Sequence, residues 1–227
     1  MEALAPQLLK VLGIIWINVI LSGDNAVVIA LACRGLPPAT RQTGMVLGAG
    51  VAVAMRIAFT VAVASLLATP FLKIVGGLLL FWIAVKLVTD DPAEDENVKE
   101  TDRLWQAVRT IAVADAVMSL DNVLAIAAVA KDSTLLLVLG LAISIPLIVA
   151  GAALIMAMLE RAPFLVWAGA GLLGWVAGEM ILSDPWLIGQ IGADVAERAE
   201  IPFAAISAVF VVALAFVLRR GSAADHA

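Results

Sequence analysis

The sequence is poor in the residues from which most enzyme sites and metal clusters are built. It has one cysteine, Cys33, and one histidine, His226, so it can form neither an intramolecular disulfide nor a thiolate metal cluster. It also carries no nucleophile–base arrangement, phosphate-binding loop or HExxH pattern, so we expect neither enzymatic activity nor a resident cofactor. Charged residues make up 15% of the chain, against about 25% in soluble domains. The net charge of −5 comes largely from Asp90–Asp102 and does not indicate nucleic-acid binding.

Hydrophobic residues, by contrast, make up 63% of the chain, and the mean hydropathy is +1.06. A helix needs about 20 mostly apolar residues to cross a bilayer. Seven runs approach or exceed this length: Leu8–Cys33, Thr43–Thr69, Phe71–Val88, Leu104–Ala130, Ser133–Leu159, Phe164–Leu182 and Ile201–Leu218. We therefore predict an all-α, polytopic helical membrane protein that crosses the bilayer seven times.

The distribution of Lys and Arg predicts the orientation, because positive residues concentrate on the cytoplasmic side. With seven spans, one side of the membrane collects Arg34, Arg41, Lys99, Arg103, Arg161, Arg219 and Arg220, and the other collects Lys10, Lys73, Lys131 and Arg198. We expect a multi-pass protein of the bacterial cytoplasmic (inner) membrane, with its N-terminus outside and its C-terminus inside.

The chain contains an internal repeat. Ser22–Ala26 aligns with Ser119–Val123, and each segment contains an Asp-Asn pair. Downstream, Pro70–Leu72 aligns with Pro163–Leu165, and Trp82 with Trp175. Because each copy holds three spans, an odd number, the second copy would enter the membrane from the opposite face. The predicted parts are residues 1–89 as the first repeat, 90–103 as an acidic cytoplasmic linker, 104–183 as the second, inverted repeat, and 184–227 as a seventh helix with a cytoplasmic tail.

Two aspartates, Asp24 and Asp121, lie within predicted spans. A charged side chain in the bilayer is costly, about 2.5–3.5 kcal/mol by the lenient scale, and persists where it faces a cavity, a partner or an ion. Equivalent positions of inverted repeats converge near the midplane, where transporters bind their substrates. We expect both aspartates to line a substrate pathway. The alternative is a structural pair, in which each aspartate caps a helix break or bonds to a neighbouring span.

Helical spacing groups further polar residues near these aspartates, although Asp24 and Asp121 themselves would point elsewhere on a regular helix. In the first copy, Gly23 and the short polar side chains next to it favour a local helix break that would bring these groups together. Asp115, Ser119 and Asn122 share one helix face, as do Asn18, Ser22 and Asn25. The predicted site therefore offers only oxygen ligands, which suit hard divalent cations such as Mn²⁺, Ca²⁺ or Mg²⁺ and argue against Cu or Zn. The candidate metal ligands are Asp24, Asn25, Asp121, Asn122, Asp115, Asn18, Ser22 and Ser119.

Other charged residues of the predicted spans are Arg56, Lys86 and Glu179. Arg56 needs a partner and would be either a counter-ion to one aspartate in the empty site or part of a structural pair. Lys86 and Glu179 occupy corresponding positions near span ends, where long side chains reach water. The glycines at 44, 48, 76, 169 and 174 are expected to permit close helix packing.

The two Asp-Asn segments, Ser22–Ala30 and Ser119–Ile126, resemble those of the TerC family of integral membrane proteins, and the short form with an acidic central loop is most similar to its YjbE-type branch. The resemblance extends over essentially the whole chain. It implies membership of the wider LysE-type transporter superfamily and a role in metal-ion homeostasis. Several relatives are associated with manganese efflux, and the aspartates that matter there would correspond to Asp24 and Asp121.

These observations lead to one principal functional prediction, a secondary exporter of a divalent cation, with Mn²⁺ as first candidate, driven by an ion or proton gradient. Two alternatives remain open: an exporter of another solute of the LysE-type superfamily, and a membrane metal sensor or scaffold that does not transport. The expected partners are the lipid bilayer and a divalent metal ion. The oligomeric state is also open, a homo-oligomer included.

Overall fold

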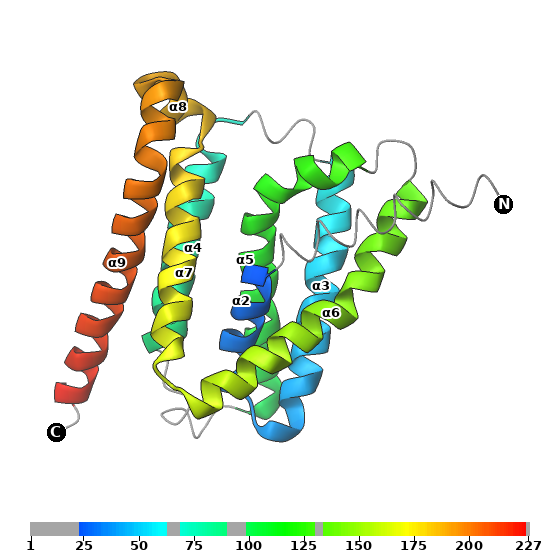
Figure 1. The fold of residues 1–227 in the computed structure, drawn as a ribbon. Coiled ribbons are helices and arrows are strands. Elements are labelled where there is room, and N and C mark those ends of the chain that lie inside the picture. The colour runs from blue at the N-terminus through cyan, green and yellow to red at the C-terminus, as the bar shows by residue number, and fades with distance from the viewer. Residues whose placement is uncertain (1–22, 63–68, 90–98, 130–133, 226–227) are drawn as a thin grey trace. The chain divides into compact units, whose positions relative to one another are not determined.

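A computed structural model describes the chain except for residues 1–22, 63–68, 90–98, 130–133 and 226–227 (Figure 1). The described residues form helices and no strand: α2 (Gly23–Cys33), α3 (Pro38–Ala62), α4 (Leu72–Thr89), α5 (Glu100–Val129), α6 (Thr134–Arg161), α7 (Leu165–Leu182), α8 (Pro185–Ile191) and α9 (Ala193–Asp225). Five of their segments are long and apolar enough to cross a membrane: Pro38–Phe59, Leu72–Thr89, Ile143–Arg161, Leu165–Leu182 and Ala193–Arg220. The all-α polytopic membrane class is thus confirmed.

Most helix boundaries lie within a few residues of the predicted ones, but the linker and the last helix differ. Helix α5 begins at Glu100, inside the segment 90–103 that the sequence predicted as linker. Helix α9 begins at Ala193 instead of near Ile201, and the short helix α8 precedes it. The added first turns of α9 contain Asp194, Glu197 and Arg198 among alanines. Ala, Glu and Arg favour a helix, so the helix extends through polar residues that precede the apolar run beginning at Ile201.

The helices form two compact units. The first unit contains α2, α3, α5 and α6 as far as Met156, and the second contains α4, α7, α8 and α9. Each unit therefore takes helices from both predicted repeats. The inverted relation of those repeats remains a prediction.

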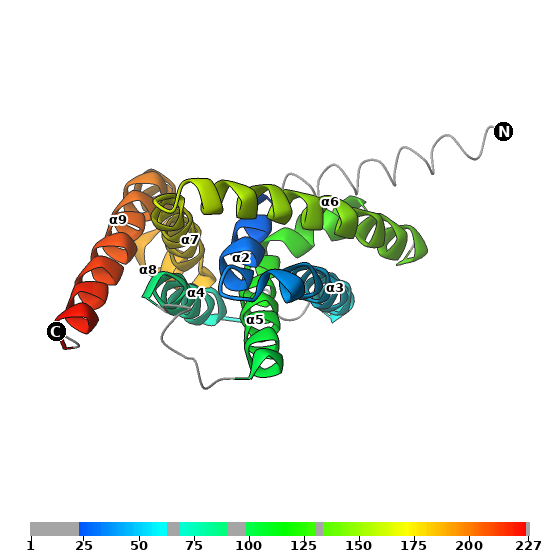
Figure 2. The same cartoon turned by 90° about the horizontal axis from the view of Figure 1, so that it is seen from below.

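In the first unit, α3 packs along α5 and α2 packs against both helices (Figure 2). The predicted glycine contacts are present here. A side chain on Gly44 would meet Leu36, and one on Gly48 would meet Ile111 of α5. The turn between α2 and α3 is closed by Arg41, whose Nε donates to the carbonyl of Leu36 at 2.8 Å.

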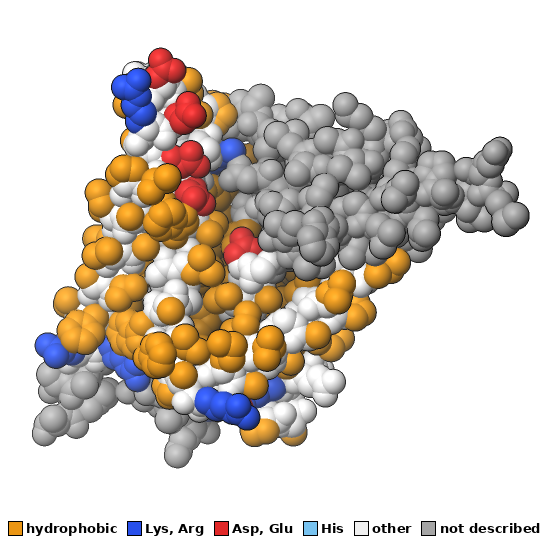
Figure 3. Space-filling model, in the orientation of Figure 1, with side chains coloured by type: hydrophobic (Ala, Val, Ile, Leu, Met, Phe, Trp, Pro, Cys, Tyr) orange, Lys and Arg blue, Asp and Glu red, His pale blue; other side chains and the backbone are white. Residues whose placement is uncertain are grey.

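In the second unit, α7 packs between α4 and α9. An ideal Cβ on Gly77 of α4 would lie 2.8 Å from the carbonyl oxygen of Ala177, and one on Gly174 of α7 would lie 3.0 Å from the Cα of Ala208 on α9. Backbones this close are typical of membrane helices that pack through small residues. Within α9, Figure 3 shows hydrophobic side chains along the middle of the helix and charged ones toward its two ends, as a membrane-spanning helix requires.

Candidate functional site

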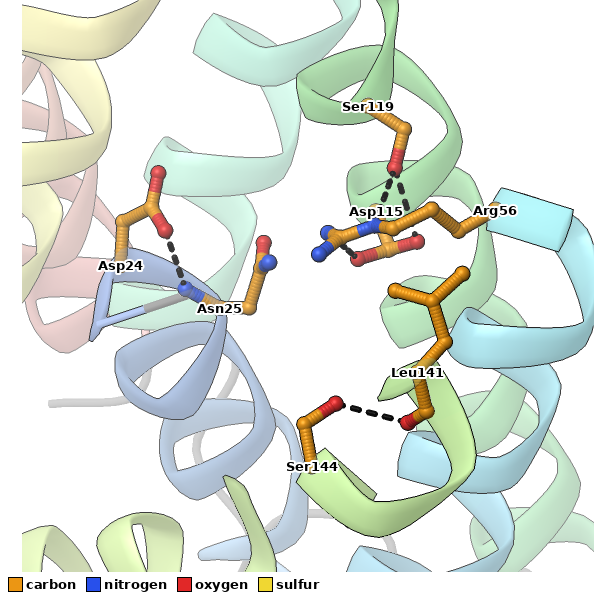
Figure 4. A network of polar contacts seen from close by, with 7 residues as sticks. All are labelled: Asp24, Asn25, Arg56, Asp115, Ser119, Leu141 and Ser144. Carbon is orange, nitrogen blue, oxygen red and sulfur yellow. Dashed lines mark hydrogen bonds and ion pairs between the residues drawn. The ribbon is translucent and has the colours of Figure 1, made fainter. Parts of the chain in front are cut away.

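A buried ion pair joins α3 to α5 in the first unit. The Nη2 of Arg56 lies 2.6 Å from Oδ1 of Asp115, and its Nε donates to the Oγ of Ser119 at 3.1 Å. The Ser119 hydroxyl in turn donates to Oδ2 of Asp115 at 3.1 Å (Figure 4). We call these three residues the Arg56 cluster. The contact between Asp115 and Ser119 confirms that these two residues share a helix face, and Asp115 forms an ion pair with Arg56.

The Arg56 cluster is almost completely withdrawn from solvent. The side chains of Arg56 and Asp115 are 1% and 4% exposed, and Ser119 is fully buried. Desolvating two charges offsets much of their attraction, so a buried pair is weak evidence for stability. Removal of one partner, however, leaves an uncompensated charge at a cost of about 3–5 kcal/mol. The two charges of the pair are therefore strongly interdependent.

Asn25 presents a buried amide that lacks hydrogen bonds. The residue is 4% exposed, and within the described part of the chain neither its Nδ2 nor its Oδ1 has a partner. In Figure 4 this amide projects from α2 toward the guanidinium of Arg56. A buried polar group without a partner costs about 1–3 kcal/mol. Such a group requires an explanation, and a ligand that completes its hydrogen bonds or coordination is one.

Asp24 lies beside Asn25 in the first turn of α2, partly buried. Its Oδ1 accepts a hydrogen bond from the backbone N–H of Asn25 at 2.8 Å. Asp24 belongs to the same compact unit as the Arg56 cluster.

The other predicted ligands lie outside the described side chains. Asn18 and Ser22 precede the first described residue, so the expected helix break next to Gly23 cannot be compared with the structure there. Asp121 and Asn122 belong to α5, whose backbone continues as a helix through both residues, but their side chains are not described. Among the described side chains, no three His, Cys, Asp or Glu residues come together as a metal site.

The sequence analysis missed Ser144. This residue of α6 is fully buried, and its hydroxyl donates to the carbonyl of Leu141 at 2.7 Å (Figure 4). It lies two residues before Pro146, which lacks the N–H for the helical hydrogen bond to the preceding turn. In the sequence, the signal for this buried polar residue was a single hydroxyl just before a proline in an otherwise apolar span.

Asp184 precedes Pro185, a pair that is typical of a turn, but in the second unit Asp184 is fully buried and connects two helices. Its carboxylate caps α8 by accepting from Trp186 N at 2.9 Å. It also accepts from the backbone N–H groups of Phe71 at 3.2 Å, Lys73 at 3.1 Å and Ile74 at 3.4 Å. Phe71 has a left-handed backbone with φ of 68°, and its ring packs on Trp186 with centroids 4.7 Å apart. Asp184 thus ties the start of α4 to the start of α8.

Lys86 and Glu179 each contact a tryptophan one turn earlier. The Nζ of Lys86 lies 5.2 Å from the centroid of the Trp82 ring, and Oε1 of Glu179 accepts from Nε1 of Trp175 at 2.6 Å. These pairs occupy matching positions in the two predicted repeats. Both charges are thus held by local contacts on their own helices.

Apolar helices of membrane-spanning length, with charged and amide groups buried among them, define a polytopic integral membrane protein with an internal polar site. Comparison with known sequences assigns the family. The model of the integral membrane protein TerC family matches residues 4–223, and the chain belongs to this family.

Relatives of the chain include two membrane proteins of Bacillus subtilis (strain 168). The uncharacterized membrane protein YjbE is 45% identical over 177 residues, which cover 78% of this chain and 81% of the relative. The uncharacterized membrane protein YceF is 25% identical over 170 residues, covering 71% and 66%. A UPF0053 protein of Buchnera aphidicola is 29% identical over 133 residues, covering 50% and 26%. No solved structure matches the chain significantly.

Proposed function

We propose that this protein is a secondary transporter that exports a divalent metal cation, with Mn²⁺ as the first candidate. The observation that carries the proposal is the buried amide of Asn25, which has no hydrogen-bond partner among the described residues, beside the carboxylate of Asp24. A cation bound to the Asp24 carboxylate could also accept the Asn25 amide oxygen as a ligand. Carboxylate, amide and hydroxyl oxygens are the ligands that hard divalent cations prefer.

The charge balance of the site supports a divalent ion. When both carboxyl groups are ionised, Asp24 and Asp115 carry two negative charges, and Arg56 carries one positive charge. The described cluster is therefore anionic, and a second cation would be attracted to it in a medium that screens charge poorly. Asp121, two residues after Ser119 on α5, is predicted to add a further carboxylate. The sequence offers no nucleotide-binding motif, so an ion or proton gradient would supply the energy.

The test is metal flux in liposomes that contain the purified full chain and a trapped dye quenched by Mn²⁺. We expect rapid quenching with the wild-type protein and with Asp102→Asn, a matched control at an exposed aspartate near the start of α5. Asp24→Asn should reduce the rate by at least about tenfold, because the substitution removes a charged ligand. Parallel vesicles receive Ca²⁺, Mg²⁺ or lysine. If a folded wild-type protein moves none of Mn²⁺, Ca²⁺ and Mg²⁺, the proposal is wrong. Movement of lysine alone would favour the alternative in which the protein exports another solute.

A further inference from the structure

The Arg56 cluster engages both oxygens of the Asp115 carboxylate. Oδ1 is held by the guanidinium at 2.6 Å, and Oδ2 is held by the Ser119 hydroxyl at 3.1 Å. Hard cations bind carboxylate oxygens directly, without an intervening N–H or O–H group. In the described arrangement, then, the guanidinium occupies the position on Asp115 that a cation would take.

We propose that Arg56 is a tethered competitor of the transported cation, a group that holds Asp115 in the empty site and must release it before the carboxylate can coordinate metal. The proposal rests on the proposed function and names a residue that would set its affinity. It explains how an acidic site can remain buried when no cation is bound, since two neighbouring carboxylates would otherwise repel each other.

The geometry suits displacement better than a permanent bond. Arg56 holds Asp115 through one nitrogen, Nη2, and uses Nε for Ser119. The described contact with Asp115 is a single bond from Nη2, not the pair of parallel bonds that makes an arginine–carboxylate contact strongest. Ser119 can remain bonded to Oδ2 while Oδ1 exchanges the guanidinium for a metal ion. Arg56 also stays nearby after displacement, and its positive charge would lower the affinity of the site for the bound cation. Release of the cation would thereby be favoured, and transport requires release as much as binding.

The experiment compares Mn²⁺ affinity in four purified full-length proteins in detergent: wild type, Arg56→Gln, Arg56→Gln combined with Asp115→Asn, and Arg109→Gln. Arg109 is an exposed arginine on the same helix as Asp115 and provides the matched control. Calorimetric titration gives the Kd, and melting with and without Mn²⁺ gives the metal-dependent shift in Tm.

A tethered competitor predicts that Arg56→Gln binds Mn²⁺ at least about tenfold more tightly than wild type. Without metal the variant should melt earlier, because Asp115 has lost its partner, and Mn²⁺ should raise its Tm more than it raises that of wild type. Adding Asp115→Asn should abolish the gain in affinity, and Arg109→Gln should behave as wild type.

A purely structural pair gives a different result. Arg56→Gln would then lower the Tm but leave the Kd for Mn²⁺ equal to that of wild type or weaker, and the proposal would be overturned. If the glutamine variant does not fold, Arg56→Lys provides the test of competition. Lysine keeps the charge but cannot span Asp115 and Ser119 together. If Arg56 competes with the cation, the Kd for Mn²⁺ should therefore fall by about threefold in this variant. An unchanged or weaker Kd in that variant also refutes competition. Absence of Mn²⁺ flux in wild type would refute the proposed function, whereas normal flux without tighter binding in these variants would refute only this inference.

Discussion

The contact between α7 and α9 leads to the sharpest prediction for stability. An ideal Cβ on Gly178 would lie 2.6 Å from Oγ and 2.8 Å from Cβ of Ser207, and 3.0 Å from the Cα of Ala204. Real Cβ atoms do not approach this closely, so Gly178→Ala must push α9 away or rotate Ser207. On the same helix, a Cβ on Gly171 would meet only Val212, at 3.5 Å, an ordinary contact. Gly171→Ala is therefore the matched control.

The two substitutions should change stability in opposite directions. Alanine in place of glycine favours the helix by up to about 1 kcal/mol at both positions. Inserting a methyl group into a close-packed contact costs about 1–3 kcal/mol, and that cost applies only at Gly178. We expect Gly171→Ala to be neutral or stabilising by up to about 1 kcal/mol, and Gly178→Ala to fall below it by about 1–3 kcal/mol.

The assay is reversible unfolding of the purified protein in mixed micelles, with a thermal melt as a second measurement. Tryptophan fluorescence reports on this contact because Trp167 of α7 lies edge-on to Phe216 of α9, with centroids 6.0 Å apart. If Gly178→Ala proves as stable as Gly171→Ala, the close approach of the two helices at this position is wrong.

Three other predictions follow from the site, the Asp184 connector and the charge distribution. Asp24→Asn and Asp121→Asn should each abolish Mn²⁺ flux, and the double variant should lose little more, because residues that act as a unit are not additive; flux retained by either single variant would contradict a shared site. Asp184→Asn should lower the stability by about 1–3 kcal/mol, measured by melting, because the uncharged amide presents one acceptor oxygen to N–H groups that the carboxylate serves with two; an unchanged Tm would contradict the connector role. Reporter fusions at the C-terminus and within the Asp90–Arg103 segment should both read cytoplasmic, and opposite readings would exclude the predicted topology.

The fold class could be read from the sequence because membrane helices obey a length and composition rule that depends little on tertiary context. The shared face of Asp115 and Ser119 was likewise predictable from helical spacing alone. The close contacts at Gly44, Gly48 and Gly174 follow from the same physics, because small residues mark the faces where membrane helices approach.

The partners of buried polar groups were less predictable, because they depend on which helices meet. Arg56 had two readings in sequence, and the choice of Asp115 required the packing of α3 on α5. The Asn25 amide looked like one ligand among several until its lack of partners became visible. Asp184 carried the local signal of a turn, whereas its bonds to Phe71 and Lys73 join segments far apart in sequence.

The exchange of helices between the two compact units bears on how the chain assembles during synthesis. Helix α3 emerges well before α5, on which it packs, and α4 emerges well before its neighbours α7 and α9. The first half of the chain therefore enters the bilayer before most of the helices on which it packs. Until those helices are inserted, the early helices must be stable individually in the bilayer, each with its own backbone hydrogen bonds satisfied. A chain cut within residues 90–98 would yield two fragments that mature only when both are made in the same cell, since each fragment holds helices that the other must bury.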